Sequence, residues 1–136
     1  MRYFLAKTEP GVYSIEQLER EKKTTWDGVK NAQAVRAIRE MRPHDKVFIY
    51  HSGAEPGVVG LARVVSEPRD DAKNPKSAVV DLEFLARLAQ PVTLAEIKNS
   101  GLFADWPLVR QGRLSTMEAP MEFVEWMRGK FPKARI

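Results

Sequence analysis

An aromatic residue and several hydrogen-bonding groups surround a glycine turn in the first quarter of the chain. Trp26 is followed by Asp27 and Gly28, and Asn31 comes three residues later. Asp-Gly is a strong turn signal, and an aromatic ring beside a turn can lie on a flat ligand whose edge the neighbouring polar groups bond. An apolar segment that starts at residue 46 ends in another polar group, residues 50–52. Together these residues predict a pocket for a flat, polar ligand.

The sequence lacks the residue patterns that would indicate catalysis or a metal site. It has no cysteine and two histidines, His44 and His51, with no H-E-x-x-H spacing and no glycine-rich phosphate loop. His51 and Ser52 do not form a base and nucleophile, because sequence neighbours on a strand point to opposite faces. The pair Asp70-Asp71 lies between basic residues and is typical of a solvated loop. We therefore expect no catalytic residue, no metal and no cofactor.

The bulk composition is that of a globular protein. The 136 residues are enough for one domain, which we place at 1–136. No run of about 18 apolar residues indicates a membrane span, and the absence of cysteine is compatible with the cytoplasm. The net charge of +4 has no basic arm, so it favours only weak attraction to phosphates. We expect a cytoplasmic monomer without a membrane partner.

The elements that must position the pocket are strands and short helices without a regular βαβ rhythm. We expect strands over residues 3–6, 24–26, 46–51, 58–65, 78–85 and 114–117. We expect helices that begin at Ser14, Asn31, Thr93 and Pro120. Segments 46–51 and 58–65 are joined by a short loop and predict an antiparallel hairpin. The expected fold is therefore α+β, with a mostly antiparallel, partly closed sheet.

Several local signals refine this outline. Ser14 with Gln17, and Thr93 with Glu96, have the spacing of a capping box. Gly60 in the middle of a strand indicates a bulge or a close backbone approach. Residues 66–77 are polar and predict an exposed excursion, residues 102–113 predict irregular structure, and residues 130–135 predict a frayed basic tail.

Four ordered segments resemble the EVE domain family. They are F-L-A-K-T-E-P at 4–10, W-D-G-V-K-N at 26–31, Y-H-S at 50–52 and R-L-S at 113–115, and the agreement extends to P-M-E-F-V-E-W at 120–126. The resemblance implies a PUA-like fold, a mixed, mostly antiparallel β pseudo-barrel flanked by short helices and related to YTH and ASCH domains. It also implies binding of nucleic acid, DNA or RNA, with a pocket for a modified base that is flipped out of the stack.

Carried onto this sequence, the resemblance makes Trp26 the stacking wall of the pocket. It implies contacts to the base from Asp27, Gly28, Asn31, Lys7, Thr8, Glu9, Ser52 and Ser115. It leaves Lys30, Arg36, Arg39 and Arg113 as candidates for phosphate contacts. Ser77 stands where some members have a second tryptophan, so we expect Trp26 to be the only large aromatic wall.

Each of these residues also has a purely structural interpretation. Trp26 could belong to the core, Asn31 could cap a helix, Lys7 could pair with Glu9, and Ser52 could be only a turn residue. Arg113 could anchor a strand, and the helix arginines could simply be solvated. Two other functions also stay open: a binding module for a small nucleoside-like or anionic metabolite, and an enzyme acting on nucleobases or RNA.

Overall fold

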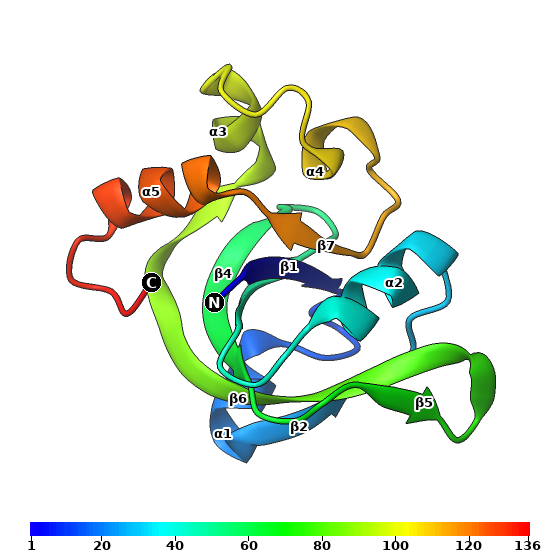
Figure 1. The fold of residues 1–136 in the computed structure, drawn as a ribbon. Coiled ribbons are helices and arrows are strands. Elements are labelled where there is room, and N and C mark those ends of the chain that lie inside the picture. Colours follow the sequence, from blue (N-terminus) through cyan, green and yellow to red (C-terminus); the bar gives the residue numbers. More distant parts are fainter.

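Seven strands form one curved sheet in the computed structural model, which describes residues 1–136 (Figure 1). They are β1 (Tyr3–Thr8), β2 (Lys23–Trp26), β3 (Lys46–His51), β4 (Gly57–Val64), β5 (Arg69–Asp71), β6 (Asn74–Thr93) and β7 (Thr116–Ala119). The order across the sheet is β2-β6-β4-β3-β1-β7, with β5 paired to β6. Only β1 and β3 run parallel. The expected α+β class with a mostly antiparallel sheet is confirmed.

Five short helices accompany the sheet, and none is long and apolar enough to cross a membrane. They are α1 (Ile15–Glu21), α2 (Ala32–Glu40), α3 (Leu94–Asn99), α4 (Pro107–Arg110) and α5 (Met121–Lys130). The end strands β2 and β7 do not pair with each other, so the sheet stays open. Helix α2 packs against both β6 and β7 and covers this opening (Figure 1). Its buried face consists of Ala34, Val35 and Ile38.

Helix α1 lies unusually close to the sheet because Gly60 in β4 has no side chain. A Cβ at this position would lie 2.5 Å from Cδ1 of Ile15 and 2.8 Å from the carbonyl oxygen of Ala86. The pairing of β4 also shifts register between Val58 and Gly60. Both features confirm the bulge and close approach expected from a glycine within a strand.

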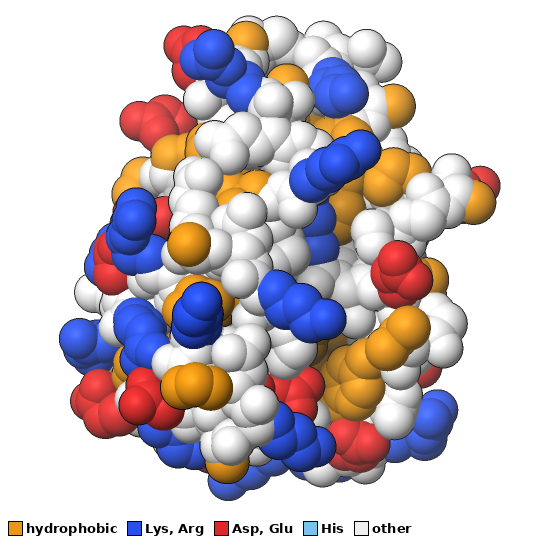
Figure 2. All heavy atoms as spheres, turned by 90° about the vertical axis from the view of Figure 1, so that its right-hand side faces the viewer, with side chains coloured by type: hydrophobic (Ala, Val, Ile, Leu, Met, Phe, Trp, Pro, Cys, Tyr) orange, Lys and Arg blue, Asp and Glu red, His pale blue; other side chains and the backbone are white.

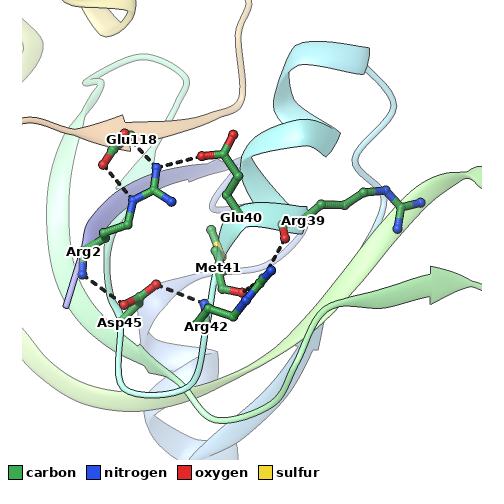
Figure 3. Close-up of polar contacts among 7 residues, drawn as sticks. All are labelled: Arg2, Arg39, Glu40, Met41, Arg42, Asp45 and Glu118. Atoms are coloured by element: carbon green, nitrogen blue, oxygen red, sulfur yellow. Dashed lines mark hydrogen bonds and ion pairs between the residues drawn. The ribbon is translucent and has the colours of Figure 1, made fainter.

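A polar cluster at the amino terminus holds α2 against the sheet (Figure 3). The guanidinium of Arg2 donates to Glu40 at the end of α2 and to Glu118 in β7, at 2.7 and 2.9 Å. The buried carboxylate of Asp45 accepts the backbone N–H groups of Arg2 and Arg42, each at 3.0 Å. Because these bonds join β1, α2 and β7, they fix the helix that covers the opening of the sheet.

The structure corrects several element boundaries. Strand β6 runs over twenty residues, well beyond 78–85, and its start pairs with β5 inside the segment expected to be an exposed excursion. Helix α4 lies within the segment expected to be irregular, and β7 begins two residues later than expected. The tail is tied down rather than frayed: Lys46 donates to the carbonyl oxygen of Arg135 at 2.7 Å, and Ile136 packs against the core.

Candidate nucleic-acid interface

The ends of β1 and β2 and their adjoining loops enclose a pocket of about 560 Å³. Strands β1 and β2 are far apart in the order of the sheet, but the curvature turns both of their ends toward one side (Figure 1). The pocket is lined by Lys7, Thr8, Val12, Tyr13, Glu21, Thr24, Thr25, Trp26, Asp27, Gly28, Val29 and Ser115. Seven residues from three of the EVE-like segments therefore meet here: Lys7, Thr8, Trp26, Asp27, Gly28, Val29 and Ser115.

Trp26 lies in the wall of the pocket but is only 7% exposed. Its neighbour is Tyr13, whose ring is perpendicular to the indole, at 88° and with the ring centroids 6.1 Å apart. The expectation of a single large aromatic wall is therefore wrong, because Tyr13 supplies a second one. Ser77 is not part of the lining; it is buried behind the pocket and donates to the carbonyl oxygen of Val29.

The side chains of Tyr13 and Glu21 form a fixed pair at the pocket. The Tyr13 hydroxyl donates to one carboxylate oxygen of Glu21 at 2.7 Å, and the amide of Gln17 donates to the other at 3.2 Å. Burial raises the pKa of the Tyr13 phenol; the Thr24 hydroxyl opposes this effect, and the Glu21 carboxylate adds to it. The backbone of Tyr13 is held as well, since Thr8 donates its hydroxyl to the Tyr13 carbonyl oxygen at 2.9 Å.

Lys7 brings a cation to the wall formed by β1. Its ammonium donates to the carbonyl oxygen of Gly112 at 3.0 Å and lies 5.4 Å from the ring centroid of Tyr50. Burial lowers the pKa of Lys7. The Lys7 backbone N–H donates to the carbonyl oxygen of Ser115 at 2.8 Å. This bond explains why residues distant in sequence line the same pocket.

The turn after β2 depends on glycine. Gly28 has φ of +77°, a conformation that side-chain-bearing residues rarely adopt. The turn directs the exposed Asp27 toward the pocket and carries the chain to Asn31, the N-cap of α2.

A sequence model of the EVE domain matches residues 2–129 of the chain. The chain belongs to the EVE domain family. It is 35% identical to thymocyte nuclear protein 1 of Rattus norvegicus over 125 aligned residues, and the match covers 71% of this chain and only 55% of that relative. This chain thus spans little more than half the length of that relative.

Solved structures have the same fold as this EVE domain over nearly its whole length. A protein from Agrobacterium tumefaciens has a TM-score of 0.88 at 31% identity, with all of both chains covered. The human THYN1 protein, in complex with DNA that contains 5-methylcytosine, has a TM-score of 0.85 at 28% identity, with 96% of this chain and 97% of that chain covered. The expected PUA-like fold of this EVE domain is confirmed.

Three residues that the resemblance implied do not line the pocket: Glu9, Asn31 and Ser52. The Asn31 side chain accepts the backbone N–H groups of Gln33 and Ala34, so it acts as a helix cap. Ser52 donates its N–H to the carbonyl oxygen of Thr8 at 2.9 Å, which ties the end of β3 to β1. Ser52 instead lines a separate hollow beside His51.

The candidate phosphate contacts divide into free and engaged side chains. Arg39 is engaged, because its guanidinium bonds Asp70 at 2.9 Å and the carbonyl oxygen of Ser77 at 3.2 Å. Lys30 and Arg113 are exposed and make no ion pair, and they follow or precede lining residues closely in the sequence. Arg36 is also unpaired but borders a shallower hollow between α2 and β7.

The ends of β1 and β2 point toward the face shown in Figure 2. On this face, Lys and Arg side chains are scattered around a hollow that has hydrophobic side chains at its margin (Figure 2). The cations are interspersed with neutral surface and with acidic side chains rather than gathered into one stripe (Figure 2). This distribution suits contacts to a few phosphates around a bound nucleotide.

Sequence reasoning missed two prominent residues of the pocket, Tyr13 and Glu21. Tyr13 follows the Pro10-Gly11 turn directly after the first EVE-like segment, and this proximity was the available signal. Glu21 is the last residue of a short amphipathic helix, where an exposed glutamate is common and gives no indication of a binding role. Only tertiary packing brings these two residues to the ends of β1 and β2: Thr8 holds the Tyr13 backbone, and α1 packs on β6 and β2.

Proposed function

We propose that this EVE domain binds nucleic acid, DNA or RNA, without catalysing a reaction, and that its pocket receives a modified base flipped from the stack. The observation that carries the proposal is the pocket itself. It combines two aromatic rings, Trp26 and Tyr13, with fixed donors and acceptors. The likeness to the human THYN1 protein, whose structure holds DNA with 5-methylcytosine, supports the same ligand class for this chain.

The two rings differ in exposure and would make different contacts with a base. Stacking of a base on an aromatic face contributes about 1–3 kcal/mol. Trp26 exposes only a small part of its ring, so it forms the back of the pocket, and the more exposed Tyr13 provides additional contact area. Thr8, Ser115 and the backbone of Gly28 surround them with groups that can bond the edge of the base.

Phosphate contacts are proposed for Lys30, Arg113 and Arg36. These side chains are free to release counterions when they meet a phosphate, which drives most non-specific binding. Arg39 would have to exchange Asp70 for a phosphate, so it contributes less than the other three.

A small-molecule function has one observation in its favour, since the pocket is large enough for a free nucleoside. An anionic metabolite fits less well, because two carboxylates, Glu21 and Asp27, line the pocket against the single ammonium of Lys7. The cytoplasmic location and the monomeric state remain predictions from sequence.

The proposal is tested by titrating fluorescent oligonucleotides, with and without modified bases, at several salt concentrations. We expect affinity to fall with salt, and we expect Lys30→Ala and Arg113→Ala each to reduce the salt slope by about 1. Lys98→Ala is the matched control, because this exposed lysine lies on α3 and makes no ion pair. Binding of free nucleosides that gains nothing from flanking phosphates would favour the small-molecule alternative. Absence of oligonucleotide binding, or equal effects of all three variants, would overturn the proposal.

A further inference from the structure

The carboxylate of Glu21 is the most firmly oriented acceptor in the pocket. Tyr13 and Gln17 each donate to a different oxygen of it, so both its position and its plane are set by neighbours. Asp27 also lines the pocket, but it takes part in no side-chain hydrogen bond or ion pair. A rigid acceptor gives geometric selectivity that a freely rotating one does not.

Two hydrogen bonds leave each oxygen of Glu21 with a free lone pair. An ionised carboxylate can only accept hydrogen bonds. It can therefore accept one from the amino group of a base, whereas it repels a carbonyl oxygen at the same position. Cytosine, 5-methylcytosine and adenine have such an amino group, whereas uracil, thymine and hypoxanthine have a carbonyl oxygen at the same position. Lys7 in β1 also lines the pocket and provides a donor.

We propose that Glu21, positioned by Tyr13 and Gln17, recognises the exocyclic amino group of the bound base and thereby selects amino-bearing bases over their oxo counterparts. This inference rests on the proposed function, because it concerns the base held in the same pocket. It assigns specificity to a residue at the end of α1, outside the segments that carry the resemblance to the family.

The sharpest probe is a pair of single-stranded oligonucleotides that carry 5-methylcytosine or thymine at one central position. The two bases share the ring methyl group and differ at C4, in amino against oxo, and in the hydrogen at N3. A hydrogen bond to a charged group corresponds to about a tenfold preference for 5-methylcytosine. Adenine against hypoxanthine gives a second, independent pair.

Glu21→Gln should reduce the preference to near unity, because a glutamine amide can rotate and donate to the carbonyl of thymine. Tyr13→Phe keeps the ring but frees the carboxylate, so it should weaken the preference several-fold without abolishing binding. The matched control is Glu19→Gln on the same helix, since Glu19 pairs with Arg87 and does not line the pocket. This control should retain the wild-type preference.

The outcomes separate this inference from the proposed function. Salt-dependent binding of both oligonucleotides with equal affinity, or a preference unchanged in Glu21→Gln, would overturn the role of Glu21 and leave nucleic-acid binding standing. Binding of neither oligonucleotide would overturn both. A preference that Glu21→Gln and Glu19→Gln reduce equally would show a general charge effect and would also overturn the inference.

Discussion

We expect one histidine to make the stability of this EVE domain depend on pH. His51 ends β3, and its Nε2 accepts the backbone N–H of Ile15, the first residue of α1, at 3.0 Å. A ring nitrogen can accept only while it is unprotonated. Burial lowers the pKa of His51 below its ordinary value of 6.5, and Arg87 lowers it further, while Glu16 opposes them.

The direction of this pH dependence follows from whether the folded or the unfolded chain binds a proton at His51 first. Below pH 6.5 the unfolded chain protonates His51 before the folded chain does, so the free energy of unfolding falls as the pH is lowered. Protonation removes one hydrogen bond, about 1 kcal/mol, and places a cation at a helix amino terminus, roughly 0.3–1 kcal/mol more. Because pH 5.5 lies only one unit below the ordinary pKa of 6.5, linkage limits the loss between pH 8 and pH 5.5 to about 1.4 kcal/mol, and we expect a loss of about 1 kcal/mol.

Urea unfolding between pH 8 and pH 5.5 measures this loss, and NMR titration of the ring protons reports the pKa of His51 directly. His51→Gln keeps a side-chain acceptor without a titrating group, so its stability should stay nearly constant over the same range. His44→Gln serves as the control, because His44 is exposed and makes no side-chain hydrogen bond. The reasoning is refuted if His51→Gln loses stability as steeply as the wild type.

Three further stability changes follow from single positions and are measured by urea unfolding. His44 has φ of +82°, so His44→Gly should be about 1 kcal/mol more stable than His44→Ala, and equal stabilities would contradict the cost of this backbone conformation. Gly60→Ala should lose about 3 kcal/mol, because the new Cβ meets Ile15 and a backbone oxygen; a loss under about 1 kcal/mol would mean that α1 shifts freely. Asp45→Ala leaves two N–H groups without their acceptor and should lose about 3 kcal/mol, with Asp45→Asn intermediate; equal losses would indicate that charge alone matters.

Local chemistry explains which elements could be predicted from the sequence. Ser14, Asn31 and Thr93 cap their helices as expected, because an N-cap bond reaches only two or three residues along the chain. The capping boxes were only half correct. Gln17 and Glu96 bond other side chains, Glu21 and Lys130, instead of returning to the cap. These competing partners, Glu21 and Lys130, lie outside the four-residue capping pattern.

Long-range pairing explains what could not be predicted. Strand β6 is extended over twenty residues because β5, β2 and β4 pair with successive parts of it. Its polar beginning near Asn74 contains the loop signals of an excursion, and only the partner strand β5 makes it part of the sheet. The same limit applies to the pocket. The motifs predicted Lys7, Trp26 and Ser115, whereas Tyr13 and Glu21 reach the pocket only through tertiary contacts, the bond from Thr8 to the Tyr13 backbone and the packing of α1 on β6 and β2.

Helix α1 connects His51 to the pocket. Its first residue depends on His51 and on the close approach at Gly60, and its last residue is Glu21 in the pocket. The cations Lys30 and Arg113 belong to other segments of the chain. As the pH is lowered and His51 becomes protonated, the preference for amino-bearing bases should therefore fall first. The overall affinity for oligonucleotides should fall only at a lower pH. Titration of both probe oligonucleotides from pH 8 to pH 5.5 tests this order, and a parallel loss of preference and affinity would show that α1 does not act separately from the phosphate contacts.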